Sequence, residues 1–100
     1  MRIEQYAIIE VENLDKILNY RLIAEQTHSS MFKTGKVKRK LAEEFTPDEI
    51  IMIGKISVKA EKWYLKALPK EEVKITMDEF YLWQKLSKFC IKYCTMHGGK

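Results

Sequence analysis

The sequence predicts an all-α fold, a small bundle of three to four helices in a single helical domain over residues 1–100. Three observations favour it: apolar residues recur at helical spacing, two capping boxes mark helix starts, and only four Gly and two Pro interrupt the chain. Apolar residues make up 46% of the chain. That fraction is enough to form one core in a domain of this length.

The N-terminal third contains neither Gly nor Pro up to Thr34. Residues spaced by three or four share one helical face, and here they are Ile3, Ala7, Val11, Leu14, Leu18 and Leu22. We therefore expect a helix over residues 2–28. The alternative is a strand within residues 3–11, because Ile8 and Ile9 are β-branched. We prefer the helix because that strand has no obvious partner in the sequence.

The middle of the chain carries the strongest local signal. Residues 29–36 contain Ser-Ser and Thr-Gly, which are typical of a loop, and residues 37–45 are a candidate short helix. The run Thr-Pro-Asp-Glu at 46–49 then combines an N-cap Thr, a Pro at the first helical position and a Glu at the third. This capping box predicts a helix that ends near Leu68, because Pro69 lacks the amide hydrogen needed to continue it.

A second capping box, Thr-Met-Asp-Glu at 76–79, predicts the last helix. It should stop near His97, before the two glycines that follow. Residues 73–75 are an extended connector at most. The predicted core combines apolar residues of the three long helices: Leu14, Leu18, Ile53, Ile56, Trp63, Leu82, Leu86 and Phe89.

The net charge of +4 is unevenly distributed, because the basic surplus follows residue 29. Three basic tracts result, one between residues 33 and 40 and one along each capped helix. They consist of Lys33, Lys36, Lys38, Arg39, Lys40, Lys55, Lys59, Lys62, Lys66, Lys85, Lys88 and Lys92. Gathered on one side, these residues would form a phosphate-binding surface. The alternative is that they are solvated helix faces that keep the protein soluble.

The motifs indicate binding rather than catalysis, and we expect neither an enzyme nor a cofactor. A nucleophile elbow, a His-Glu-x-x-His motif and a complete phosphate-binding loop are all missing. The weak metal candidates are Cys90, Cys94 and His97, which are spaced by four and three on one helical face, with His28 as a fourth ligand. We expect no metal, because both cysteines fit the core stripe as small apolar residues.

We expect a regulatory protein that docks its lysine-rich helical surface onto nucleic acid or a nucleoprotein complex. The alternative is a protein–protein adaptor, or an inhibitor of a larger complex, with no direct nucleic-acid contact. A homodimer is a further alternative, since a small chain can cover apolar surface that way. The sequence lacks a signal peptide pattern and a run of about 20 apolar residues. With only two cysteines, we expect a cytoplasmic protein without membrane contact.

Overall fold

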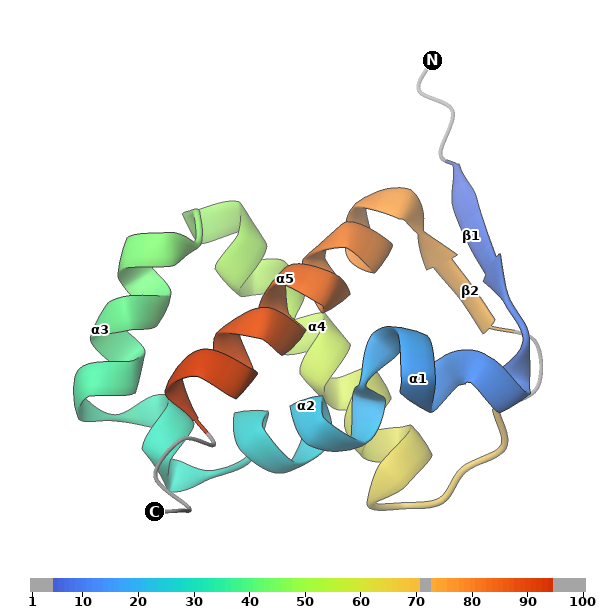
Figure 1. Ribbon diagram of the computed structural model, residues 1–100, viewed down its shortest axis with the longest axis horizontal. Coiled ribbons are helices and arrows are strands. Elements are labelled where there is room, and N and C mark those ends of the chain that lie inside the picture. The colour runs from blue at the N-terminus through green and yellow to red at the C-terminus, as the bar shows by residue number, and fades with distance from the viewer. Residues whose placement is uncertain (1–4, 71–72, 95–100) are drawn as a thin grey trace.

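The computed structural model describes residues 5–70 and 73–94, and Figure 1 shows their arrangement. The elements in chain order are β1 (Tyr6–Ile9), the 3₁₀ turn η1 (Val11–Asn13), α1 (Leu14–Leu18), α2 (Tyr20–Thr27), the 3₁₀ turn η2 (Ser30–Lys33), α3 (Gly35–Glu44), α4 (Pro47–Tyr64), β2 (Val73–Thr76) and α5 (Met77–Tyr93). The described chain is mostly helical, which confirms that part of the prediction. Two short strands are added to the expected helices.

The N-terminal segment is not the single helix predicted over residues 2–28. Tyr6–Ile9 forms strand β1, and the helical part begins only at η1. The β-branched side chains of Ile8 and Ile9 favour extended backbone, and the strand finds its partner far along the chain in β2. A strand in this region, the alternative interpretation, is therefore correct for the residues of β1.

Strands β1 and β2 pair in antiparallel fashion, with Tyr6 opposite Thr76 and Ala7 opposite Ile75. Alternate residues of a strand face opposite sides of the sheet. Ile9 and Ile75 are buried against the helices, whereas Ile8 is 89% exposed. The segment at 73–75, expected to be a connector at most, is thus part of the strand that joins the N-terminal segment to the start of α5.

Asn19 divides the remaining N-terminal helix into α1 and α2. Its φ of 50° is in the left-handed region, which Asn adopts more readily than most residues. The side-chain amide of Asn19 donates a hydrogen bond to the hydroxyl of Ser87 on α5, and Ser87 is buried. The break therefore has a specific polar contact that apolar periodicity does not reveal.

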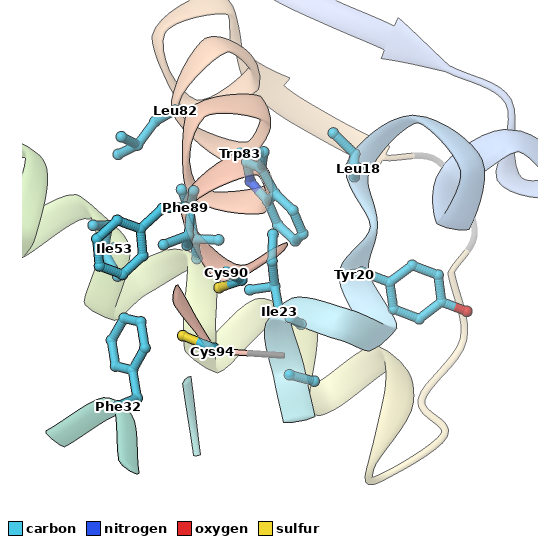
Figure 2. Packing of buried hydrophobic residues seen from close by; sticks show 14 of the residues in the cluster. Leu18, Tyr20, Ile23, Phe32, Ile53, Leu82, Trp83, Phe89, Cys90 and Cys94 are labelled. Carbon is cyan, nitrogen blue, oxygen red and sulfur yellow. The ribbon is translucent and has the colours of Figure 1, made fainter. Parts of the chain in front are cut away.

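The core lies where α1 and α2 pack against α4 and α5. Of the predicted core residues, seven are buried: Leu14, Leu18, Ile53, Ile56, Leu82, Leu86 and Phe89. Trp63 is half-buried and stacks on the fully buried Trp83, with ring centres 5.9 Å apart. Figure 2 shows Trp83 and Cys90 of α5 beside Ile23 of α2.

Both predicted capping boxes are confirmed. The amide of Glu49 donates to the Thr46 hydroxyl at 3.1 Å, and the Thr46 amide donates to the Glu49 carboxylate at 2.8 Å. Thr76 and Glu79 repeat this exchange at 3.1 and 2.9 Å. Each box satisfies amides that the first helical turn would otherwise leave without a partner.

The other ends of the helices differ from the prediction or lie beyond the described residues. Helix α4 ends at Tyr64 rather than near Leu68. Ala67 takes a left-handed φ of 50°, and the amide of Leu68 turns back to the Lys62 carbonyl at 2.8 Å. The chain thus leaves the helix before Pro69, whose ring disfavours helical backbone in the residue before it.

The last two helix bounds concern α5 and α3. Helix α5 is described to Tyr93, and its predicted end near His97 lies outside the described residues. The predicted short helix at 37–45 corresponds to α3, which starts slightly earlier, at Gly35. In the described part of the chain, no helix has both the length and the apolar character that crossing a membrane requires.

Candidate interaction surface

Helix α4 buries one face and exposes an apolar line on the opposite one. Its buried residues are Ile53, Ile56 and Ala60. Three large aliphatic side chains of α4 and its C-cap residue, Leu65, lie on the outer side at a spacing of seven: Ile51 (65% exposed), Val58 (49%) and Leu65 (53%). Residues seven apart lie almost above one another on a helix. These three therefore form one line, which we call the α4 seam.

Four lysines accompany the α4 seam, and we call them the α4 lysine flank: Lys55, Lys59, Lys62 and Lys66. Lys55 and Lys62 each follow one seam residue by four positions and precede the next by three, which places both on the outer face. Within the described residues, no lysine of the flank forms an ion pair. Their charge is therefore available to a partner.

Gly54 lies on the other side of the α4 seam, three residues after Ile51 and four before Val58. A Cβ built on Gly54 has no atom of another described element within 4 Å, so none of the elements that the structure describes requires a glycine there. In a helix interior, glycine costs about 1 kcal/mol relative to alanine. Because Gly54 has no side chain, another element can approach the backbone of α4 closely at this position on its outer surface.

Lys85 on α5 contacts Glu49 in the first turn of α4 and Phe45, which lies between α3 and α4. Its Nζ lies 3.1 Å from the Glu49 carboxylate and 4.5 Å from the centre of the Phe45 ring. The backbone amide of Thr46, and to a smaller extent Lys85, hold the pKa of Glu49 below its ordinary value. Lys85 thus connects α5 to the start of α4, and its charge is already balanced.

Lys92 also contacts groups of this chain. Its Nζ lies 5.0 Å from the centre of the Tyr93 ring, and the Tyr93 hydroxyl donates to the Glu44 carboxylate at the end of α3. Tyr93 first, and then Glu44, raise the pKa of Lys92. Lys88 is exposed and has no ion pair within the described part of the chain. Of the three α5 lysines, two therefore lie beside acidic partners.

The basic tract at 33–40 lies on η2 and α3, at the end of the molecule away from the sheet (Figure 1). Its exposed basic residues are Lys33, Lys36, Lys38 and Arg39. Lys40 is half-buried, and its Nζ lies 3.3 Å from the Glu43 carboxylate one helical turn away. The predicted basic residues are thus divided among several elements, and the α4 lysine flank is the group that lies along an exposed apolar line.

Ser57, His28 and Glu61 form a row of polar groups between α2 and α4 that superficially matches a hydrolytic triad. The Ser57 hydroxyl lies 3.5 Å from His28 Nδ1, and His28 Nε2 lies 3.4 Å from the Glu61 carboxylate. Nδ1, however, is only 2.9 Å from the Ala24 carbonyl. A carbonyl oxygen only accepts, so this contact places a proton on Nδ1, and that nitrogen cannot act as the base for Ser57.

The Ser57 hydroxyl instead forms a hydrogen bond of 2.7 Å with the Thr27 hydroxyl. The same Thr27 hydroxyl donates to the Ile23 carbonyl at 2.6 Å. Thr27 is buried at the end of α2. Buried hydroxyls require partners, and these contacts supply them. The row of polar groups therefore ties α2 to α4.

Cys90 and Cys94 are free thiols buried on the inner face of α5, which confirms their predicted place in the core. Burial raises the pKa of both thiols and so disfavours the thiolate that binds metals or attacks substrates. Among the described residues, no cluster of three or more potential metal ligands occurs. His97, the third candidate ligand, lies outside them, and His28 contacts Glu61 instead.

A surface cavity of about 330 Å³ opens where the first turns of α4 and α5 meet. Its lining residues are Asp48, Glu49, Met52, Asp78, Tyr81, Leu82 and Lys85. Acidic residues in a first helical turn are stabilised by the helix dipole, which accounts for the carboxylates. Glu49 and Lys85 pair with each other at this cavity. The sequence predicted both helix starts but not that they converge.

Comparison with known protein families, with curated proteins and with solved structures gives no match. The function is therefore argued from the surface of this chain. Sequence reasoning identified the lysines of α4 but missed the apolar line beside them. The available signal was the repeat of seven in Ile51, Val58 and Leu65, which is offset from the core stripe of the same helix.

Proposed function

We propose that this chain is a non-catalytic protein-binding module, an adaptor or an inhibitor of a larger complex, and that it docks through the α4 seam and the α4 lysine flank. The observation that carries this proposal is the exposure of Ile51, Val58 and Leu65 in one line, on a helix whose opposite face is already buried. Burial of apolar surface is the main driving force of protein association, and an exposed apolar patch marks where association occurs.

The α4 seam favours a protein partner over nucleic acid. Phosphate contacts draw their affinity from cations and counterion release, and aliphatic side chains between the lysines add nothing to that. The lysines of α5 add little to a phosphate-binding stripe, because Lys85 and Lys92 lie beside Glu49 and Glu44. The adaptor, our alternative at the outset, therefore becomes the first hypothesis.

Direct contact with nucleic acid is the second candidate. What supports it is the set of exposed cations without an ion pair in the described chain, among them Lys36, Lys38 and Arg39 on α3. Fluorescence anisotropy with a labelled duplex and a labelled single strand, at about 50 and about 200 mM salt, tests it. Affinity that falls steeply with salt would support this candidate, and negligible binding at both concentrations would contradict it.

We further propose that the module acts without catalysis or a cofactor, in the cytoplasm. The proton on His28 Nδ1 leaves Ser57 without a base there. The two buried thiols are free, as expected in a reducing compartment. Neither feature requires chemistry beyond binding.

The test is capture of partners from an extract of the native host by the tagged protein. One variant removes the α4 seam by Ile51→Ser, Val58→Ser and Leu65→Ser. The matched control removes exposed apolar side chains of α5 by Tyr81→Ser and Ile91→Ser. We expect the wild type and the control to capture the same protein and the seam variant to lose it, with all three folded by circular dichroism. Equal capture by the three proteins would contradict the proposal.

A further inference from the structure

We infer that the occupant of the α4 seam is an acidic amphipathic helix supplied by the partner protein. This inference rests on the proposed function and specifies the chemistry of the partner. Three features of α4 point to it: the length and straightness of the seam, the bare backbone at Gly54, and the charge of the lysine flank.

The dimensions of the α4 seam fit a helix. Ile51 and Leu65 lie fourteen positions apart, a distance of about 21 Å at 1.5 Å per residue. Val58 stands midway between them and is also exposed. A partner helix presents apolar side chains at spacings of three and four along a line of the same kind. It can therefore contact all three seam residues at once.

Gly54 gives the partner helix a place to approach closely. It stands between Ile51 and Val58 on the side of the seam opposite Lys55 and Lys62, and the space above it is open to at least 4 Å. Two helices pack at 8–10 Å between axes, depending on the side chains at the contact. A missing side chain at the crossing point permits the closer end of that range. The glycine that has no function within this chain acquires one in the complex.

The α4 lysine flank sets the charge of the partner. Between Ile51 and Lys66, four lysines stand against a single acid, Glu61, which already contacts His28. A partner helix with Glu or Asp beside its apolar line would pair with these lysines, and such pairs favour the correct partner and orientation. A second copy of this chain would instead bring another positive seam, so like charges would repel.

The test uses three synthetic helical peptides of about 18 residues. The first carries Leu at alternating spacings of three and four with Glu beside them. The second replaces each Glu by Lys, and the third scrambles the order of the first. Binding to the full chain is measured by fluorescence anisotropy, with a DNA duplex as competitor. Sedimentation of the protein alone reports self-association.

Two double variants with the same change in net charge locate the binding site. Lys55→Glu with Lys62→Glu reverses the α4 lysine flank, and Lys36→Glu with Lys38→Glu reverses part of α3. We expect the acidic amphipathic peptide to bind the wild type at least about tenfold more tightly than either other peptide. The α4 variant should lose about tenfold in affinity and gain affinity for the basic peptide. The α3 variant should stay within about twofold of the wild type.

A third variant, Gly54→Leu, places a side chain in the space that close approach requires, at a position where a Cβ has no atom of another described element within 4 Å. We expect it to weaken binding of the acidic peptide by roughly tenfold while the protein is at least as stable to heat as the wild type, because leucine favours a helix more than glycine does. Unchanged affinity would overturn the role of Gly54 as the crossing point.

The remaining outcomes separate this inference from the proposed function. Equal binding of the acidic and basic peptides, displacement of the peptide by the duplex, or self-association through α4 would each overturn the acidic helix as the occupant. If no peptide binds while the seam variant still loses its captured protein from the host extract, the inference fails and the proposed function stands. If the seam variant also keeps its partner, both fail.

Discussion

Helices α4 and α5 begin alike and expose different surfaces. Both start at a Thr–Glu capping box, and Lys55 and Lys62 of α4 match Lys85 and Lys92 of α5 at an offset of 30 residues. On α5, two lysines contact acidic or aromatic groups of the same chain. On α4, the matching lysines form no ion pair within the described residues and alternate with exposed aliphatic side chains.

The difference shows that a lysine stripe does not define a function by itself. On α5, Lys85 lies beside Glu49 at the start of α4, and Lys92 lies near Glu44 at the end of α3. The lysines of the α4 stripe form no ion pair with any described residue. What matters is which element lies opposite each stripe, and this depends on tertiary contacts that local sequence does not contain.

The largest effect that separates the two helices should come from a charge placed in the α4 seam. We expect Val58→Asp to weaken binding of the protein captured from the host by about 100-fold, because it replaces an apolar contact at the centre of the interface by a carboxylate that must lose its hydration and that repels an acidic partner. Ile91→Asp, on α5 and similarly exposed, should change affinity by less than about threefold. Surface plasmon resonance with the captured partner measures both, and equal losses would remove the distinction between the helices.

The next largest effect concerns the capping boxes, where the two helices should behave alike. Thr46→Ala and Thr76→Ala each remove one cap and should cost about 1 kcal/mol in the free energy of unfolding. Urea denaturation measures the change, with the Thr→Ser variants as controls that keep the hydroxyl. A cap that proves neutral would show that its helix start is held by tertiary contacts instead.

Replacing Gly54 or Gly35 by alanine should change the free energy of unfolding in opposite directions. Gly54 is inside α4 with a helical backbone and open space around it, so Gly54→Ala should stabilise the fold by up to about 1 kcal/mol. Gly35 has a φ of +57°, and Gly35→Ala should cost about 1 kcal/mol, since alanine disfavours that region. Thermal unfolding checks both. A destabilised Gly54→Ala protein would indicate a contact at Gly54 within this chain.

The smallest effect tests the charge of Glu49, which accepts a hydrogen bond from the Thr46 amide and pairs with Lys85. Because the pKa of Glu49 is lowered in the folded state, its contribution is present above the ordinary value of 4.5 and is lost as the pH falls through the lowered value. Glu49→Gln keeps a capping side chain but not the charge. It should cost roughly 0.2–1 kcal/mol at pH 7, and its unfolding midpoint should fall less on acidification. Urea midpoints between about pH 3 and pH 7 measure this, and parallel profiles would contradict a stabilising role for the charge of Glu49.

The sequence supplied the parts of the fold that local chemistry determines. Two capping boxes, Thr46 with Glu49 and Thr76 with Glu79, predicted where both long helices begin. The helical spacing of apolar residues predicted their buried faces, which contain Ile53, Ile56, Leu82 and Leu86. The sequence offered the N-terminal strand only as the alternative, on the β-branched Ile8 and Ile9. Strand β1 pairs with β2, with Ala7 opposite Ile75, and no local pattern reveals a partner more than sixty residues away.

The candidate surface was predicted in part, for a related reason. The lysines of α4 are evident from spacing, but their separation from those of α5 depends on Glu44 and Glu49. In the sequence alone, Ile51, Val58 and Leu65 cannot be told apart from the apolar residues that form the core. The structure assigns the buried face of α4 to Ile53, Ile56 and Ala60. Only then does the exposure of Ile51, Val58 and Leu65 become informative.

The helix that we propose to meet the partner is α4 rather than α5. Site-specific photocrosslinking in the native host tests this most directly, with a benzophenone side chain replacing Val58 in one protein and Ile91 in another. We predict a discrete protein adduct from position 58 and none from position 91. An adduct from position 91 alone, or adducts to nucleic acid alone, would contradict the assignment of the α4 seam as a protein-docking surface.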